Sequence, residues 1–204
     1  MGNLGPRCGR QWHLLERGVT SLRCVPTIVV PYRGDAKRRL PASLRAAVAV
    51  AMLGDVVAAA LEVGPVTVVT DDVSVVPRGA GTLVDPGGGL GAAVAAALAT
   101  LEGHALVVNA DLPTATPAAI RRLAAAGLAL VEARDGTTNA LSLPEPSVFA
   151  SLYGAGSAAR FRAHAPFATV HIPELEDDVD TPLDLERVAR RVGHRTRALL
   201  AVPA

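Results

Sequence analysis

The chain has 204 residues, half of them hydrophobic, and its 20 basic and 19 acidic residues give a net charge of +1. This length favours one domain with one substantial core, and the balanced charge excludes a global field for nucleic acid or for an anionic membrane surface. Two cysteines, Cys8 and Cys24, exclude a disulfide framework and a four-ligand zinc set. Since no continuous run approaches about 18 apolar residues, we expect a soluble, cytoplasmic protein without nucleic-acid or membrane partners, and leave a homo-oligomer open.

Residues 1–25 show no clear hydrophobic period, and we interpret them as a poorly ordered extension outside the fold. A single domain of residues 26–204 is predicted to follow. Its first helical pattern, Ser43–Leu61, has one apolar face that is formed by Leu44, Val48, Met52 and Val56.

Strand-like and helix-like runs alternate through this domain. The predicted strands are Thr27–Val30, Val66–Thr70, Thr82–Val84, Ala105–Val108, Leu128–Val131, Ala140–Leu143 and Thr169–Ile172. The predicted helices are Ser43–Leu61, Gly91–Leu101, Pro117 to about Gly127, a turn from Ser147, Ser157–Ala165 and a last helix from Thr181. Because several strand runs are apolar on both faces, the pattern predicts an α/β fold, a three-layer α/β/α sandwich with a mostly parallel sheet. Ligands of such sheets gather at the carboxyl ends of the strands.

Two short acidic motifs follow apolar runs: Asp111 in A-D-L-P, and Asp178 with Asp180 in D-V-D-T-P. Carboxylates from the ends of separate strands are how α/β enzymes hold Mg²⁺ against the phosphates of a nucleotide. A structural interpretation exists for each motif, since Asp111 fits a turn and Thr181 fits the N-cap of a helix whose first residue is Pro182. The two motifs together favour a metal site formed by Asp111, Asp178 and Asp180.

Two loops fit the phosphates and base of a nucleotide. The first, after Thr27–Val30, carries Arg33 and Lys37, whose charges suit phosphate oxygens, although a solvated basic loop has the same composition. The second contains Gly88 and Gly89, which let a backbone approach a base or phosphate closely, although a flexible turn also explains them.

Two further segments are typical of anion sites. Residues 134–139, R-D-G-T-T-N, end a strand with donors and hydroxyls, and Ser157 fits the N-cap of a helix that follows Gly154. Ordinary capping explains Ser157 equally well. The five histidines are scattered, and we interpret them as structural or exposed because none stands in a nucleophile arrangement.

Six motifs occur in order: A-K-R-R-L at 36–40, D-P-G-G-G-L at 85–90, A-D-L-P at 110–113, G-T-T-N-A-L at 136–141, Y-G-A-G-S-A-A-R at 153–160 and D-V-D-T-P at 178–182. The ordered set resembles the bacterial and archaeal guanylyltransferases of coenzyme F420 biosynthesis, which activate phosphoenolpyruvate or 2-phospho-L-lactate. The likeness spans about residues 26–192.

The resemblance implies a nucleotide-diphospho-sugar transferase-like fold. It also implies a nucleotidyltransferase that joins the phosphate of a small phosphorylated carboxylic acid to the α-phosphorus of GTP and releases pyrophosphate. The resemblance implies that Lys37 binds the GTP phosphates and that Lys37 and Asp111 are catalytic. It implies that Mg²⁺ is bound by Asp111, Asp178 and Asp180. It implies that phosphoenolpyruvate is bound by Thr138, Gly154 and Ser157.

The chain departs from this family pattern in three places. The first loop is about two residues short, Gly91 stands where the family usually has Asn, and the G-T-T-N motif lacks a glycine that is often present. Because each departure touches substrate contacts, two alternatives stay open: another nucleotidyltransferase, acting on a molybdopterin or a sugar, and a catalytically silent α/β binding module.

Overall fold

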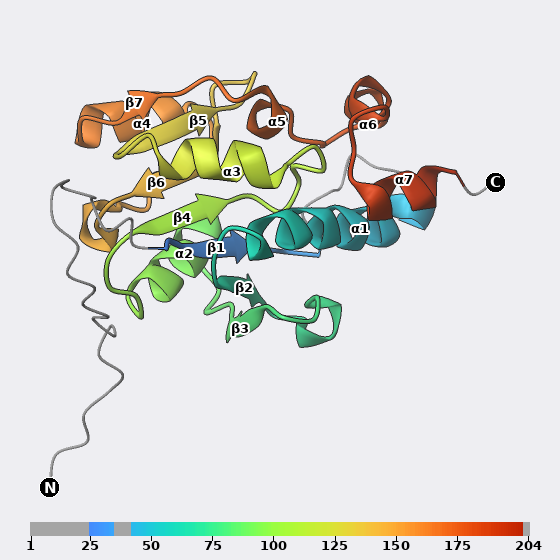
Figure 1. The fold of residues 1–204 in the computed structure, drawn as a ribbon, viewed down its shortest axis with the longest axis horizontal. Helices are drawn as coiled ribbons and strands as arrows, with labels where there is room; N and C mark the ends of the chain where they lie inside the picture. Colours follow the sequence, from blue (N-terminus) through green and yellow to red (C-terminus); the bar gives the residue numbers. More distant parts are fainter. Residues whose placement is uncertain (1–24, 35–41, 202–204) are drawn as a thin grey trace, which may run out of the picture.

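The computed structural model describes residues 25–34 and 42–201, so the predicted extension lies outside the described residues except for Val25 (Figure 1). The strands are β1 (Thr27–Pro31), β2 (Val66–Thr70), β3 (Gly81–Val84), β4 (Ala105–Val108), β5 (Ala129–Glu132), β6 (Thr138–Leu143) and β7 (Ala168–Thr169). The α-helices are α1 (Ala42–Leu61), α2 (Leu90–Leu98), α3 (Pro117–Ala124), α4 (Ser157–His164), α5 (Pro173–Glu176), α6 (Pro182–Val188) and α7 (His194–Leu200). Short 3-10 turns cover Val73–Val75 (η1) and Pro146–Val148 (η2).

The strands form one sheet in the order β3-β2-β1-β4-β6-β5-β7. All neighbouring pairs are parallel except those that include β6, which runs antiparallel to both β4 and β5. The predicted mostly parallel sheet is therefore confirmed.

Helices cover both faces of the sheet, as the two-sided apolar strands require. In β1, Ile28 and Val30 face a core that includes residues of α1, α3 and α5, whereas Val29 faces a second core with α2 and α4. All three side chains are fully buried. This alternation confirms the predicted three-layer α/β/α sandwich, and a third, small core joins α1 to α6 and α7, with α7 alongside α1 (Figure 1).

Strand β6 runs backwards because it follows β5 through a tight turn. The amide of Ala133 donates to the carbonyl of Thr137 (2.9 Å), and Gly136 takes a left-handed φ of 82°, which favours glycine. The start of β6 consequently lies where the parallel strands end, and the amide of Asn109, just past β4, donates to the carbonyl of Asn139. The prediction that this strand begins at Ala140 missed its first two residues, which are the ones that reach this edge.

The C-terminal part differs from the sequence prediction in two ways. Strand β7 has only two residues and is followed by α5, where a strand through Ile172 was expected. The single last helix is divided into α6 and α7 around Gly193, which is the N-cap of α7. The predicted start is confirmed, since Thr181 caps α6 and Pro182 is its first residue.

Helix α1 is more apolar than the sequence analysis allowed. Arg45 and Asp55 interrupt the apolar run, yet the window Leu44–Leu61 has a mean hydropathy of 1.9 and is long enough to cross a membrane. In this fold 56% of that window is buried, as for a core helix. The predicted apolar face holds for Val48, Met52 and Val56 but not for Leu44, which is 48% exposed because the core does not reach the first turn.

Candidate active site

The acidic motifs meet at the carboxyl edge of the sheet. Asp111 lies in the loop that leaves β4, and Asp178 and Asp180 stand on either side of Val179. Val179 is fully buried in a small core beside Val48 and Val188, and its amide donates to the carbonyl of Asp111 (3.1 Å). A buried Val179 and this backbone bond therefore hold the two motifs against each other.

The three carboxylates converge. One oxygen from each of Asp111, Asp178 and Asp180 lies within 4.8 Å of the others, and all three residues are partly buried. Carboxylate oxygens are the hard ligands that Mg²⁺ prefers, and a small number of protein ligands leaves coordination positions for phosphates and water. The residues present therefore fit a divalent cation.

The structural interpretation of D-V-D-T-P is also correct. The hydroxyl of Thr181 accepts from the amide of Asp184, and Asp184 accepts from the amides of Thr181 (2.9 Å) and Asp180 (3.2 Å). Burial opposes ionisation of Asp184, but hydrogen bonds from Thr181 and Arg187 outweigh it and hold the pKa of Asp184 below its usual value. The helix cap thus fixes the backbone that presents the carboxylates of Asp178 and Asp180.

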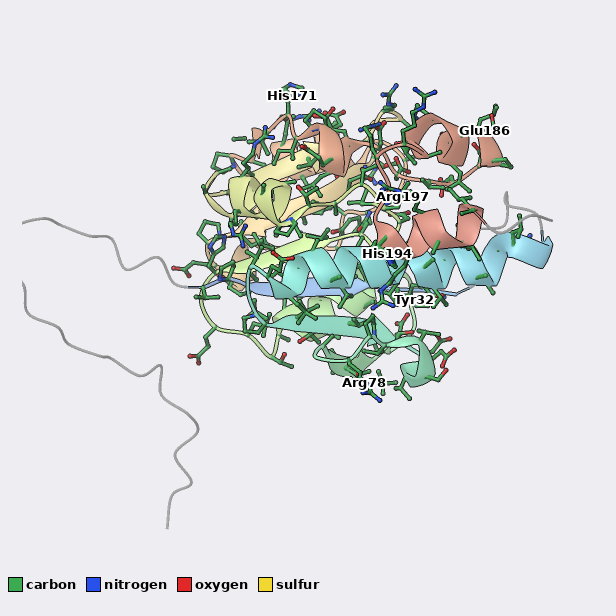
Figure 2. All side chains as sticks on the ribbon, turned by 45° about the vertical axis from the view of Figure 1, so that its right-hand side comes forward. Tyr32, Arg78, His171, Glu186, His194 and Arg197 are labelled. Atoms are coloured by element: carbon green, nitrogen blue, oxygen red, sulfur yellow. The ribbon has the colours of Figure 1, made fainter. Side chains whose placement is uncertain are left out.

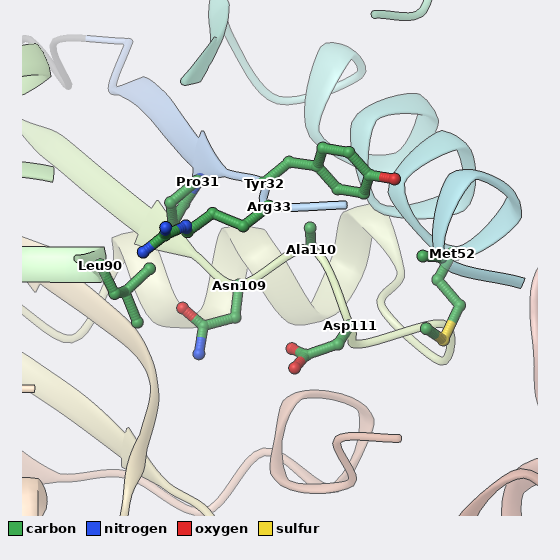
Figure 3. Close-up of a pocket in the computed structure, with 9 residues that line it drawn as sticks. Pro31, Tyr32, Arg33, Met52, Leu90, Asn109, Ala110 and Asp111 are labelled. Atoms are coloured by element: carbon green, nitrogen blue, oxygen red, sulfur yellow. The ribbon is translucent and has the colours of Figure 1, made fainter. Parts of the chain in front are cut away.

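A cavity of about 180 Å³ opens beside Asp111 (Figure 3). It is mostly apolar, with Tyr32 and Arg33 from the end of β1, Leu90 from α2 and Asn109 from the end of β4 in its lining. The amide nitrogen of Asn109 donates to the carbonyl of Thr138 (3.2 Å), while its Oδ1 is buried without a hydrogen-bond partner among the described residues. The cavity therefore offers an acceptor that the described protein groups leave unused.

Of the predicted nucleotide contacts, Arg33 lies at this cavity. Arg33 lines it, and its Nε lies 3.8 Å from Asp85 Oδ2, at the start of the glycine loop. Gly88 and Gly89 are exposed, with φ of 81° and 97°, so their backbone conformation by itself favours glycine. Lys37 lies outside the described residues. Gly91 is buried, and a Cβ there would come 3.0 Å from Ser151 Cβ, which excludes a larger side chain at this place in the present packing.

The predicted acceptor residues are brought together. Ser157 donates from its hydroxyl to the hydroxyl of Thr138 (3.0 Å), both being buried, and the amide of Ser157 donates to the carbonyl of Gly154. The expectation that Ser157 is an N-cap is wrong: Gly156, with a left-handed φ of 67°, is the N-cap of α4, and Ser157 is its first residue. Arg160 holds this loop by donating to the carbonyls of Leu152, Tyr153 and Ala155.

The described histidines lie away from this site. His171 and His194 are exposed (Figure 2). His104 lies at the opposite, amino edge of the sheet, where its Nε2 is 3.0 Å from Ser142 Oγ. Sequence analysis missed this pair, in which Ser142 is fully buried and lies at the edge of the sheet away from the three carboxylates.

Comparison with known proteins places the chain in one family. It is 37% identical to the phosphoenolpyruvate guanylyltransferase of Streptomyces coelicolor, over 86% of this chain and 95% of the relative. It is 36% identical to the 2-phospho-L-lactate guanylyltransferase of Natrialba magadii, over 79% and 82%. The chain belongs to this guanylyltransferase family. The resemblance inferred from the six motifs is confirmed, and no family profile matches the chain.

Solved structures agree on the fold of this guanylyltransferase family member. A candidate nucleotide-diphospho-sugar transferase from Desulfovibrio desulfuricans superposes with a TM-score of 0.64 at 15% identity, covering 85% of this chain and 93% of that protein. The 2-C-methyl-D-erythritol 4-phosphate cytidylyltransferase of Thermus thermophilus superposes with a TM-score of 0.56 at 18% identity, covering 88% and 100%. The predicted nucleotide-diphospho-sugar transferase-like fold is confirmed.

Three residues in or beside the candidate site of this guanylyltransferase family member were not found by sequence reasoning. Asn109 directly follows β4 and was detectable by the same strand-end argument that identified Asp111. Arg160 looks like an ordinary helix residue, and its contacts to the loop become visible only in three dimensions. Sequence analysis did not single out Asp177, beside D-V-D, yet it is 3% exposed, and Arg134 binds it instead of the anion expected there.

Proposed function

We propose that the chain is a Mg²⁺-dependent guanylyltransferase that condenses GTP with phosphoenolpyruvate, or with 2-phospho-L-lactate, in coenzyme F420 biosynthesis. The products are a GMP-activated diphospho intermediate and pyrophosphate. The family membership supports the reaction type, and the named relatives use these two acceptors. The cytoplasm, where we expect the chain, supplies GTP.

The observation that carries this proposal is the convergence of Asp111, Asp178 and Asp180 beside the cavity. Three carboxylates within 4.8 Å of one another repel, so their grouping is costly unless a cation or another positive group compensates. A bound Mg²⁺ would neutralise charge on the phosphates and help to stabilise the attacking and leaving oxygens. These three aspartates are the residues that would hold it.

The protein supplies position and charge on the nucleotide side. Arg33, at the cavity mouth, presents a guanidinium to phosphate oxygens while Asp85 orients it. Asn109 offers its Oδ1 to a donor of the nucleoside. Lys37 keeps its proposed role at the GTP phosphates, and the turn of Gly88 and Gly89 leaves room for the base.

On the acceptor side, the hydroxyl of Thr138 accepts from Ser157 and keeps its own hydrogen for a phosphate or carboxylate oxygen. An oxygen of the acceptor phosphate attacks the α-phosphorus of GTP, forming one P–O bond as the bond to the β-phosphate breaks. The bond electrons leave with pyrophosphate. A phosphate monoester is largely dianionic near neutral pH, so no general base is required.

The test is pyrophosphate release by the purified chain with GTP, MgCl₂ and each acceptor, with the product identified by ³¹P NMR. We expect turnover that requires GTP, Mg²⁺ and an acceptor together, and a Asp111→Asn control without it. Turnover with a sugar phosphate or a molybdopterin instead would favour the other nucleotidyltransferases. Nucleotide binding without turnover on any acceptor would favour the silent binding module. Either result contradicts the proposal.

A further inference from the structure

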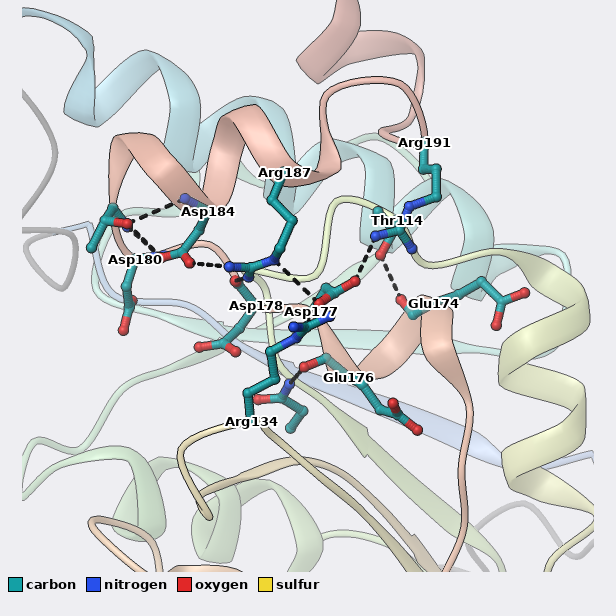
Figure 4. A network of polar contacts seen from close by, with 12 residues as sticks. Thr114, Arg134, Glu174, Glu176, Asp177, Asp178, Asp180, Asp184, Arg187 and Arg191 are labelled. Carbon is teal, nitrogen blue, oxygen red and sulfur yellow. Dashed lines mark hydrogen bonds and ion pairs between the residues drawn. The ribbon is translucent and has the colours of Figure 1, made fainter.

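A cluster of three arginines surrounds the residue next to the metal-site aspartates. Asp177 directly precedes Asp178 and is 3% exposed. Figure 4 shows its carboxylate among the guanidinium groups of Arg134, Arg187 and Arg191. The arginines come from separate places: the turn between β5 and β6, helix α6, and the link between α6 and α7.

The contacts are close and use both carboxylate oxygens. Arg134 Nε lies 2.8 Å from Oδ1, Arg191 Nη2 lies 2.6 Å from Oδ2, and Arg187 Nε lies 3.5 Å from Oδ1. Charge-assisted hydrogen bonds of this length are among the stronger polar contacts in proteins. The carboxylate of Asp177 therefore links three separate segments of the chain.

The backbone that follows Asp177 is held at every residue up to the helix cap. Arg187 Nη2 lies 3.5 Å from the carbonyl of Asp178, the amide of Val179 donates to Asp111, and the amide of Asp180 donates to Asp184. Arg187 also binds Asp184 at 2.6 Å, so it contacts both ends of this segment. The direction of the Asp178 and Asp180 side chains thus depends on the backbone that the arginines anchor.

We propose that Asp177 and the arginines Arg134, Arg187 and Arg191 form a clamp that positions Asp178 and Asp180 for a divalent cation. This inference rests on the proposed metal site but assigns residues that touch neither metal nor substrate. The clamp also joins the turn that leads to Thr138 to the metal segment, so acceptor side and metal side share one anchor.

If the arginines acted only through their charge, their removal would have the opposite effect on cation binding to the one that the clamp predicts. Removing a positive charge near a cation site strengthens the attraction for the cation, whereas loosening a clamp weakens binding. Arg191 is the variant of choice because its side chain is 46% exposed, so we expect its loss to leave the core packing unchanged. Arg190 is the matched control, since it is exposed and has the same charge one residue away.

The experiment is Mn²⁺ binding by electron paramagnetic resonance to the full chain, which needs no turnover. We expect one tight site in the wild type, a loss of affinity of about tenfold in Asp177→Asn, a several-fold loss in Arg191→Met, and partial recovery in Arg191→Lys. Arg190→Met should bind Mn²⁺ as the wild type does or slightly more tightly. Circular dichroism spectra of all variants confirm that each is folded.

Failure of the proposed metal site and failure of the proposed clamp give different results. If the wild type binds no Mn²⁺, the metal site and the clamp are both wrong. If the wild type binds Mn²⁺ and Arg191→Met binds it equally or more tightly, the clamp alone is wrong, because the field of the charges then explains the data. If Asp177→Asn is unfolded, the comparison of Arg191→Met with Arg190→Met still decides.

Discussion

Buried and partly buried aspartates at two places in this molecule have opposite surroundings. At the junction of α1 and α7, Asp55 is 7% exposed, and its two oxygens accept from the amides of Arg195 and Thr196, both at 2.9 Å. At the carboxyl edge of the sheet, the carboxylates of Asp111, Asp178 and Asp180 converge on one another instead. Asp55 completes the first turn of a helix, whereas the cluster gathers like charges.

The difference separates a carboxylate that the fold uses from the carboxylates that we propose to bind a metal. The helix amides at Asp55 account for both of its oxygens, and the packing is so close that a Cβ on Gly193 would lie 2.7 Å from Asp55 Oδ1. Convergence of three carboxylates adds mutual repulsion, which a bound cation would relieve. The first arrangement should fail in stability when it is broken, and the second in activity.

The largest expected effect is that of Asp111→Asn. The amide fits the site but cannot offset the charge of the metal, so kcat/KM should fall about a thousandfold, equivalent to about 4 kcal/mol of barrier. The free energy of unfolding should change by less than about 1 kcal/mol, since one of three converging charges is removed. Steady-state kinetics at saturating Mg²⁺ and urea titration check both values. Near wild-type rates would show that Asp111 is no metal ligand.

The reverse pattern is expected for Asp55→Ala. Two amides at the start of α7 lose their acceptor, which should cost about 2–3 kcal/mol of stability and lower the melting temperature by about 5–10 °C. Rates measured well below the melting temperature should stay close to those of the wild type. If Asp55→Ala melts at the wild-type temperature, or loses activity while folded, the contrast between a stabilising Asp55 and the acidic cluster at the sheet edge is wrong.

Thr138→Val tests the acceptor side with a somewhat smaller effect. Loss of a hydrogen bond to a charged group costs about 1.5–3 kcal/mol, or roughly ten- to hundredfold in kcat/KM for the acceptor, with the KM for GTP nearly unchanged. Ser157→Ala should act less strongly, because its hydroxyl is donated to Thr138. Ser142→Ala, at the far end of the same strand, is the matched control and should leave both KM values unchanged. Equal effects on GTP and acceptor would contradict the assignment of Thr138.

The smallest expected effect is a change in the pH dependence of stability at His104, which lies neither at the junction of α1 and α7 nor in the acidic cluster. Burial lowers the pKa of His104 below its usual value, so the unfolded chain binds the proton more readily than the folded one. The contribution of neutral His104 is therefore present above pH about 6.5 and is lost as the pH falls through that value toward the folded pKa. Melting curves should show the wild type losing more stability than His104→Gln between pH 8 and pH 5. Parallel pH profiles would contradict this.

Much of the fold was predictable because local patterns determine it. Apolar runs such as Thr27–Val30 require cover on both faces, and Thr181-Pro182 marks the start of a helix. The place of Asp111 was predictable for a related reason, since it follows β4 and the carboxyl ends of parallel strands meet at one edge of a sheet. The D-V-D segment was expected at the same edge, but it follows α5 and not a strand, and the backbone bond from Val179 to Asp111 holds it there.

The remainder depended on contacts between distant segments. In the sequence, Asp55 has the pattern of an ordinary acidic residue of α1. In the fold, α7 places the amide of Arg195, 140 residues further along the chain, against the Asp55 carboxylate. Ser157 looked like a cap because its type favours caps, but Gly156 takes the left-handed conformation and frees Ser157 to bind Thr138. Asp177 differs from Asp178 only in its surroundings, which no local pattern records.

The most direct test of the metal site is the anomalous scattering of Mn²⁺ in crystals of the chain grown with MnCl₂ and GTP. The account predicts one strong peak at coordination distance from the carboxylate oxygens of Asp111 and of Asp178 or Asp180, next to the cavity lined by Arg33 and Asn109. Crystals of Asp55→Ala should show the same peak, and those of Asp111→Asn should lose it. A peak elsewhere, or nucleotide bound in the cavity with no metal at these three aspartates, would contradict the account.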